Sequence, residues 1–436
     1  MYSIKKIQSQ LKSLYEKGAA HLFIGNFLIK FIGLFGSIFI VRFLTKNEYG
    51  LLGYAENMYS YGYIFVGLGL AISILRYGII IKDPGELKGL YNYIYKTQTI
   101  INLLLVCCIC FISIIYPHPK QYTGSTYLLI ILCIGLPFQD LTSTNLTIER
   151  TKMNNRRYMY FSLMAAFLSV FARVVGAKIG GVNGTVIGKV FVEICVCIVI
   201  FILVYKRCGY KVQEKKLDRK TKKEILLYSV NNMLANGIWT LFMITEVYLI
   251  GVILKEPNTL ADYKVAYVIP SNMAIITSSI AVFITPYFIQ NENNLEWIRE
   301  NYFKVFKANL LIMGVLALFL FILSPQLILF LYGEKYINVV PLMRILLIAH
   351  FINAGIKSLH VSLLAAMGCA KENMIISIVG FVLQILSASI ALFKFGVIGL
   401  AVNNVIMYAL MSTTVMFIFW KKYKIRLYRR KSNDKY

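Results

Sequence analysis

Long apolar runs recur along the whole chain and constrain its fold more than any other feature. Most of these runs hold 20 or more residues with at most one or two charges. A helix needs about 20 apolar residues to cross roughly 30 Å of hydrocarbon. Charged residues make up only 15% of the chain, below the roughly 25% of a soluble domain, and hydrophobic residues make up 58%. The sequence therefore predicts an all-α polytopic membrane protein.

The runs between polar breaks predict about twelve transmembrane helices. We expect them at 20–44, 51–73, 97–117, 125–147, 159–180, 184–206, 225–254, 264–290, 306–324, 338–366, 373–394 and 396–420. Six precede a basic segment and six follow it, which predicts two parallel six-helix bundles around a central cavity. A faint echo of residues 42–60 in residues 251–271, each a helix end followed by a short polar turn, supports this internal repeat.

Lys and Arg gather in alternate loops, and this asymmetry orients the chain. The positive-inside rule places both termini in the cytoplasm. The formal net charge of +26 is then explained by contact with anionic lipids, without nucleic acid. The predicted segments are a cytoplasmic amphipathic N-terminus (1–19), an N-terminal bundle (20–206), a basic cytoplasmic linker (207–224), a C-terminal bundle (225–420) and a basic cytoplasmic tail (421–436).

The sequence carries no motif for catalysis, nucleotide binding or metal binding. Its eight cysteines lie within predicted spans or near predicted inner loops, with no pair in an outer loop, and its four histidines lack metal-ligand spacing. The stretch "GGVNGTVIGKV" differs from a phosphate loop, because Val190 follows Lys189 where Ser or Thr is needed. Gly184 and Gly188 are better interpreted as a small-residue contact between helices. We expect no cofactor, no metal and no enzymatic activity.

Charged side chains inside the predicted spans are the strongest functional signal. A charge at mid-bilayer costs from about 2.5 to more than 10 kcal/mol, so it usually faces a partner or a water-filled cavity. The basic candidates for substrate binding are Lys30, Arg173, Lys189, Arg344 and Lys357. The acidic candidates for coupling to a proton or Na⁺ are Glu56, Asp140, Glu193 and Glu246.

Helical spacing places some of these charges on shared faces. Lys189 and Glu193 lie four residues apart, so they line a substrate site or simply neutralise each other as a structural ion pair. His350 and Lys357 lie seven residues apart and also share a face. Neither pattern decides between a functional and a structural role.

Two groups of polar and aromatic side chains are candidates for sugar contact. Tyr59 and Tyr63 share a face with Glu56, although packing and interface anchoring are commoner roles for Tyr. The seventh span carries a stripe formed by Asn232, Asn236, Trp239 and Glu246. That stripe either lines a cavity or binds a neighbouring helix.

Three stretches of the chain resemble a known family. "VRFLTKNEYGLLGY" (41–54), "GLGLAISILRYG" (67–78) and "LILFLYGEKYINVVPLMRILLIA" (327–349) are similar to stretches of the bacterial polysaccharide-biosynthesis flippases. These translocate O-antigen and capsule repeat units and belong to the multidrug/oligosaccharidyl-lipid/polysaccharide exporter superfamily. The resemblance covers residues 20–420 in span number and loop length. The matching motif positions, which we interpret as structural turns, are Glu48, Tyr49, Gly50, Gly333, Glu334 and Tyr336.

The resemblance implies a cationic lumen that accepts an undecaprenyl-diphosphate-linked oligosaccharide. Such a protein would move the head group across the cytoplasmic membrane by alternating access, with Lys and Arg meeting the diphosphate. The implied partners are the lipid-linked oligosaccharide, membrane lipids and a polysaccharide polymerase, with a proton or Na⁺ as counter-ion.

Three alternatives stay open at this point. A multidrug exporter of the same superfamily should carry an acidic cation site in its first helix, where this chain has Lys30. A lipid II flippase usually has two further spans. A membrane polysaccharide polymerase or acyltransferase tends to have long outer loops or clustered catalytic residues, and the loops here are short.

Overall fold

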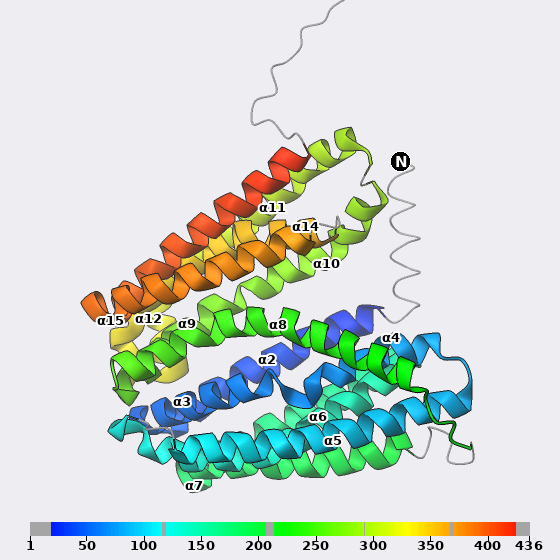
Figure 1. Cartoon of the computed structure of the whole chain (residues 1–436). Coiled ribbons are helices and arrows are strands. Elements are labelled where there is room, and N and C mark those ends of the chain that lie inside the picture. Colours follow the sequence, from blue (N-terminus) through cyan, green and yellow to red (C-terminus); the bar gives the residue numbers. More distant parts are fainter. Residues whose placement is uncertain are drawn as a thin grey trace, which may run out of the picture. The chain divides into compact units, whose positions relative to one another are not determined.

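A computed structural model describes residues 19–115, 119–152, 154–205, 213–291, 293–366 and 370–423. Within these ranges the chain is helical and forms no strand. The predicted amphipathic N-terminus and most of the basic tail lie outside the described residues. The helices of Figure 1 are α2 (Ala19–Phe43), α3 (Lys46–Tyr63), α4 (Leu70–Ile80), α5 (Pro84–Ile115), α6 (Thr123–Thr151), α7 (Asn155–Tyr205), α8 (Arg219–Ile253), α9 (Pro257–Asn272), α10 (Ala274–Gln290), α11 (Leu295–Ile322), α12 (Ser324–Tyr332), α13 (Val340–Ile352), α14 (Ser358–Ala366) and α15 (Ala370–Lys422).

Among the described residues, seven helices are long and apolar enough to cross a membrane, and a bent pair adds an eighth. Two of them, Arg156–Val204 and Glu372–Lys422, hold 49 and 51 residues, about twice what one crossing needs. Each contains non-helical glycines, at Gly180 and Gly181 in α7 and at Gly396 in α15. The all-helical, multi-pass fold class is confirmed, and these breaks are consistent with twelve crossings.

Small residues let the two halves of α7 pack closely against each other. A Cβ on Gly176 would lie 2.0 Å from the carbonyl oxygen of Gly184, and one on Gly188 would lie 2.5 Å from that of Ala172. These distances leave no room for a side chain, so the backbones touch. The predicted small-residue contact at Gly184 and Gly188 is confirmed. In α15, drawn in orange and red in Figure 1, a Cβ on Gly399 would lie 2.6 Å from the carbonyl oxygen of Ala391.

The second predicted span is broken rather than continuous. Helix α3 is followed by the 3-10 segment η1 (Val66–Gly69) and then by α4, with a bend of 45° between the two parts. Gly67, Leu68 and Gly69 all have positive φ angles. Glycine adopts this conformation without penalty, whereas a leucine does so only under strain. The paired glycines of "VGLG" are the sequence signal for this break, which a hydropathy count does not detect.

The first helical hairpin turns within two residues, Leu44 and Thr45. The Thr45 hydroxyl accepts a hydrogen bond from the Glu48 amide at 3.2 Å, and the Glu48 carboxylate accepts one from the Thr45 amide at 2.9 Å. This capping box satisfies two amides that the start of a helix leaves open. The stretch "KNEYG", which we expected to form the turn itself, is therefore the beginning of α3.

The two segments that echo each other in sequence lie against each other in the structure. A Cβ on Gly50 would lie 2.0 Å from the carbonyl oxygen of Pro257, the first residue of α9. Beside Pro257, the Thr259 hydroxyl donates to the Glu256 carboxylate at 2.7 Å. In the later motif Gly333 has a φ of 85° and ends α12, so it serves the turn that its position predicts.

The helices form two compact units that divide between Ala261 and Asp262. In unit 1, α7 packs against α2 and α6, and α6 also packs against α4 and α5 (Figure 1). Leu70 of α4 is fully buried in the core of this unit. In unit 2, α15 packs against α13 and α14, and Tyr302 of α11 is fully buried. The predicted bundle limits on either side of the 207–224 linker remain predictions.

The described end of the basic linker binds to the start of α5. Lys215 donates to the Asp83 carboxylate at 2.7 Å, and its amide donates to the Gly85 carbonyl at 3.1 Å. The hydrogen bond from Lys215 lowers the pKa of Asp83 and, reciprocally, raises the pKa of Lys215. A Cβ on Gly89 would lie 2.1 Å from the Lys215 carbonyl oxygen, so glycine is required for this approach.

Candidate functional site

An ion pair joins α3 to α7 in unit 1. Arg173 donates through Nη2 to the Glu56 carboxylate, and the two side chains are 24% and 26% exposed. One is a predicted phosphate-binding cation and the other a predicted coupling carboxylate. Opposite charges offset each other's desolvation cost, so this contact by itself explains how Arg173 and Glu56 can both lie within a span.

A second ion pair lies further along α7. Lys189 Nζ is 3.7 Å from Glu193 Oε1, the pairing that their four-residue spacing predicts. The same ammonium lies 4.7 Å from the centroid of the Tyr59 ring. The Tyr59 hydroxyl in turn donates to Gln139 Oε1 at 2.7 Å. Lys189 thus belongs to a cluster of α3, α6 and α7 in which both a carboxylate and an aromatic ring stabilise its charge.

The buried carboxylate of Asp140 is tied to the broken span. Asp140 is 4% exposed and accepts a hydrogen bond from Asn102 Nδ2 at 2.7 Å. Asn102 Oδ1 accepts from the Gly67 amide at 2.7 Å. A Cβ at Gly67 would lie 2.5 Å from Asp140 Oδ2. The carboxylate therefore contacts the non-helical backbone between α3 and α4 directly.

Two further charged candidates of unit 1 lie on α2 and α8. Lys30 lies exposed on α2. Glu246 is 3% exposed on α8. Their proposed roles in substrate binding and ion coupling stay predictions.

The candidates for sugar contact are placed only in part. Tyr63 is 37% exposed, and its ring centroid lies 5.9 Å from that of Tyr59. Asn232 donates to the Tyr228 carbonyl of its own helix at 2.8 Å. The side chains of Asn236 and Trp239 lie outside the described residues. Sugar contact by this set stays a prediction.

The functional candidates of unit 2 centre on Lys357, which is 2% exposed. Its ammonium lies 5.4 Å from the Tyr408 ring centroid. His350, predicted to share its face, is also 2% exposed, with ring centroids 5.0 Å from Tyr267 and 5.7 Å from Tyr408. Four side chains thus form a chain of contacts: Tyr267 of α9 lies against His350 of α13, and both His350 and Lys357, from the segment after α13, lie against Tyr408 of α15.

Lys357 is the last residue of a π-helix, η4 (Asn353–Lys357), that interrupts α13 and α14. The wider turn redirects backbone carbonyls, and other helices satisfy them. Thr277 of α10 donates to the Ala354 carbonyl at 3.0 Å, and Asn309 of α11 donates to the Gly355 carbonyl at 2.9 Å. Single π turns are rare and are frequently found at functional sites. This one sets the position of Lys357.

Arg344 faces a different part of unit 2. Its Nε donates to Ser324 Oγ at 2.9 Å and to the Phe321 carbonyl at 3.3 Å. Its guanidinium carbon lies 4.9 Å from the centroid of the Phe321 ring. Arg344 therefore packs on the end of α11, whereas Lys357 packs on α15.

Sequence reasoning missed several polar groups that the structure places beside these charges. Asn102 lies in an apolar run, and an amide within such a run is a signal that a search for charges alone overlooks. Tyr267 and Tyr408 gave no signal, because the chain holds 30 tyrosines and most serve packing or interfaces. In the described part of the chain, no three His, Cys, Asp or Glu side chains are grouped so as to hold a metal ion.

Residues 39–341, more than two thirds of the chain, match the family described as polysaccharide biosynthesis protein. The chain belongs to this family. No curated protein matches it. The match includes the broken span, the Glu56–Arg173 and Lys189–Glu193 ion pairs and the later motif up to the start of α13, and it agrees with the resemblance seen in the sequence.

Solved structures share the fold across nearly the whole chain. The lipid II flippase MurJ, in an inward closed conformation, matches with a TM-score of 0.73 and 16% identity, over 91% of this chain and 87% of that one. An inward-facing multidrug resistance MATE family transporter of the MOP superfamily matches with a TM-score of 0.69 and 16% identity, over 91% of this chain and 94% of that one. A MOP superfamily transporter from Pyrococcus furiosus matches with a TM-score of 0.63 and 12% identity, over 94% of this chain and 95% of that one. At these identities the likeness concerns the fold alone.

Proposed function

We propose that this protein translocates undecaprenyl-diphosphate-linked oligosaccharide repeat units across the cytoplasmic membrane for surface polysaccharide assembly. The family description supports a role in polysaccharide biosynthesis. The fold is shared with a lipid II flippase and with multidrug transporters, which supports a transporter that works by alternating access rather than an enzyme. The prenyl tail would stay in the bilayer while the charged head group moves through the protein.

Lys357 is the observation that carries this proposal. Its side chain is 2% exposed, on a π-helix that two other helices support. The sequence has no Asp or Glu from 301 to 333 or from 335 to 371, which covers most of α11 and all of α13, η4 and α14. A buried cation on a stretch of the chain without carboxylates suits an anionic substrate group. Tyr408 beside it, and Tyr267 beside His350, suit a sugar ring or a pyrophosphate-linked hydroxyl.

Arg173 and Lys189 have a secondary place in the proposed binding of diphosphate. Each is paired with a carboxylate, so an incoming phosphate would have to compete with Glu56 or Glu193. Asp140 is the best-supported candidate for coupling to a proton or Na⁺, because it is buried and reaches the backbone break at Gly67 through Asn102. Discontinuous helices are recurrent ion sites in transporters.

Complementation tests the proposed function. The full chain would be expressed in a bacterium that lacks its own O-antigen or capsule flippase and carries the matching glycan-assembly genes. We expect surface polysaccharide to be restored by the wild type and by Lys394→Ala, an exposed cation of α15, and lost with Lys357→Ala at equal expression. If lipid-linked units reach the outer face without this protein and only fail to polymerise, the protein is not their flippase and acts as a polymerase.

A lipid II flippase is a second candidate, favoured by the shared fold. The same chain would be expressed in cells depleted of their lipid II flippase. Growth rescue would identify lipid II as the substrate, whereas restored polysaccharide without growth rescue would support the repeat-unit substrate. The family description favours the second outcome.

A further inference from the structure

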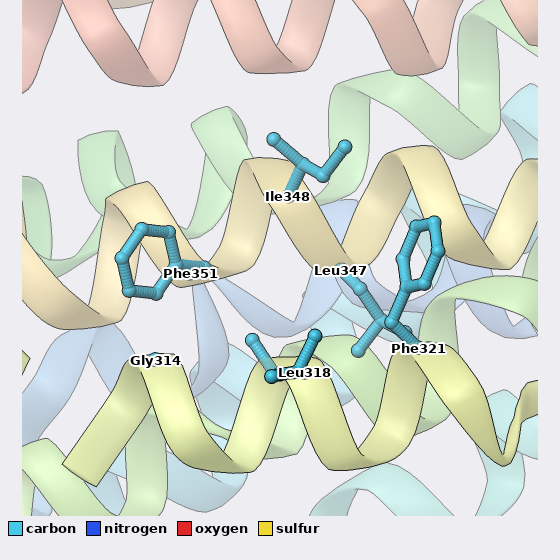
Figure 2. A pocket seen from close by; sticks show the side chains of 7 residues that line it. Gly314, Leu318, Phe321, Leu347, Ile348 and Phe351 are labelled. Carbon is cyan, nitrogen blue, oxygen red and sulfur yellow. The ribbon is translucent and has the colours of Figure 1, made fainter. Parts of the chain in front are cut away.

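An apolar groove runs between α11 and α13 in unit 2. Its volume is about 330 Å³. Figure 2 shows the lining residues Gly314, Leu318 and Phe321 on α11 and the lining residues Leu347, Ile348 and Phe351 on the neighbouring helix α13. No polar side chain lines the groove among the described residues.

The sequence builds this groove from two matched stripes. On α11 the lining residues Gly314, Ala317, Leu318 and Phe321 follow the spacing 0, 3, 4 and 7, which puts them on one helix face. On α13 the lining residues Leu347, Ile348 and Phe351 follow the same spacing when it starts from Arg344. One face of α13 therefore begins with a cation and continues as the wall of the groove.

The groove opens on an apolar surface. Leu318 and Ile348 in its walls are 61% and 46% exposed. Val315, Phe319 and Ile322 on the adjoining faces of α11 are each more than half exposed. Both helices belong to segments that are long and apolar enough to cross a membrane. Apolar side chains exposed in a membrane span are in contact with lipid chains.

Arg344 is held rigidly at the end of the groove. Its Nε is occupied by Ser324 Oγ and the Phe321 carbonyl, and its guanidinium stacks on Phe321, which is itself a wall of the groove. Among the described residues, no ion pair involves Arg344. Because Nε is the nitrogen used to fix the side chain, the two terminal nitrogens remain to bind a ligand.

We propose that this groove binds one anionic glycerophospholipid of the surrounding bilayer, with its phosphate on Arg344 and an acyl chain between α11 and α13. Arginine binds phosphate through paired N–H donors, and burying a chain segment in the groove adds apolar contact. Seven residues separate Gly314 from Phe321, so the groove extends roughly 10 Å along α11, which suits part of one chain.

The chemistry of the groove favours a phospholipid over the transported substrate. Arg344 supplies a single cation, which matches one phosphate rather than a diphosphate. No side chain in the walls could bind a glycan by hydrogen bonds. The site is also separate from Lys357, which packs on α15, so it does not depend on the proposed function.

Native mass spectrometry of the purified full-length protein tests this proposal. The protein would be loaded with phosphatidylglycerol or with phosphatidylcholine, and retained lipid would be counted as the detergent is removed by collision. We expect phosphatidylglycerol to be retained about tenfold better by the wild type than by Arg344→Gln, since one charge-assisted contact is lost. Lys394→Gln, an exposed cation of α15, is the matched control and should behave as wild type.

A second variant tests the groove independently of the charge. Ala317→Trp fills the space between α11 and α13, so retention of phosphatidylglycerol should fall to the level of Arg344→Gln. Leu386→Trp, on the exposed apolar face of α15, adds a similar ring elsewhere and should leave retention unchanged. Each variant must elute as a single species of wild-type size, and Arg344→Met replaces Arg344→Gln if that variant does not.

Three results would overturn the proposal. Equal retention by Arg344→Gln and Lys394→Gln would show that Arg344 does not bind the lipid phosphate. Equal retention by Ala317→Trp and Leu386→Trp would show that no acyl chain binds between α11 and α13. Displacement of phosphatidylglycerol from the wild type by undecaprenyl phosphate, at equal concentration and with the same dependence on Arg344, would assign the groove to the tail of a prenyl lipid.

Discussion

The two units of this protein treat charge inside the membrane differently. Unit 1 pairs its cations with carboxylates, as Glu56 with Arg173 and Lys189 with Glu193 show. Unit 2 has no Asp or Glu at all from 373 to 433, and its buried Lys357 lies among aromatic rings. The spans predicted from the sequence contain both signs of charge in unit 1, whereas those from 264 to 420 contain cations and histidines without carboxylates.

We propose that this difference separates charges with a structural role from charges that bind a ligand. An ion pair inside a span satisfies itself, so it stabilises a helix contact without a ligand. A buried cation beside a phenol ring has part of its desolvation cost offset by the ring, and we expect it to suit an incoming anion. Unit 2 is therefore where we expect a phosphate-bearing ligand to bind most strongly.

The largest expected effect is on transport, from Lys357→Met. Removing the ammonium should reduce translocation by at least about 30-fold, because losing one partner of a buried charged contact costs 2 kcal/mol or more. The unfolding temperature should stay the same or rise, since a buried charge is replaced by an apolar side chain of similar length. The amount of surface polysaccharide measures translocation, and thermal unfolding in detergent measures the unfolding temperature.

Lys394→Met is the control for this experiment, because Lys394 is exposed on the same helix as Tyr408. A Lys357→Met protein that transports normally would contradict the contrast between the units. A variant that unfolds before it can be assayed would show that Lys357 is structural, as the charges of unit 1 are expected to be.

A smaller effect, on stability, is expected at the ion pair of unit 1. Arg173→Ala should lower the free energy of unfolding by about 2 kcal/mol, less than for a wholly buried pair because a quarter of each side chain is exposed. Adding Glu56→Gln should recover about half of that loss, because the uncompensated carboxylate is then removed. Denaturant unfolding of the two single variants and the double variant gives the coupling energy. Additive losses would show that the contact contributes nothing.

The support of the π-helix should contribute about 1 kcal/mol. Asn309→Leu removes its hydrogen bonds to the carbonyls of Ala354 and Gly355, while Thr277 still donates to Ala354. We expect a modest loss of unfolding free energy together with reduced transport, because the position of Lys357 changes. Asn301→Leu is the control, since Asn301 bonds only within its own helix among the contacts described for it. Normal transport in Asn309→Leu would mean that the π turn does not position Lys357.

The smallest effect is expected at the exposed contact between Asp83 and Lys215. Its contribution is present at neutral pH, because Lys215 lowers the pKa of Asp83, and it is lost as the pH falls below the ordinary aspartate value of 3.8. Asp83→Asn should remove that acid dependence and leave the unfolding temperature nearly unchanged. The measurement is the amide-exchange protection factor of residues 213–218, relative to the unfolded chain at the same pH, at pH 3 and pH 7. Identical protection factors at both pH values in the wild type would contradict this account.

Much of this protein follows from its sequence alone. Apolar runs long enough to cross a bilayer determine the all-helical membrane fold, because no other structure satisfies its own backbone in lipid. The glycines at 176, 184 and 188 determine how closely the two halves of α7 approach. Spacing within one helix determined the contact of Lys189 with Glu193, since residues four apart meet on one face.

Only the tertiary structure decided which charges meet across helices. Glu56 and Arg173 are 117 residues apart, and no local pattern links them. The break at Gly67 depends on Asn102 of another helix, and the π turn before Lys357 depends on donors from α10 and α11. These features arise where polar groups of several helices must satisfy one another away from water, which is a property of packing and not of any single segment.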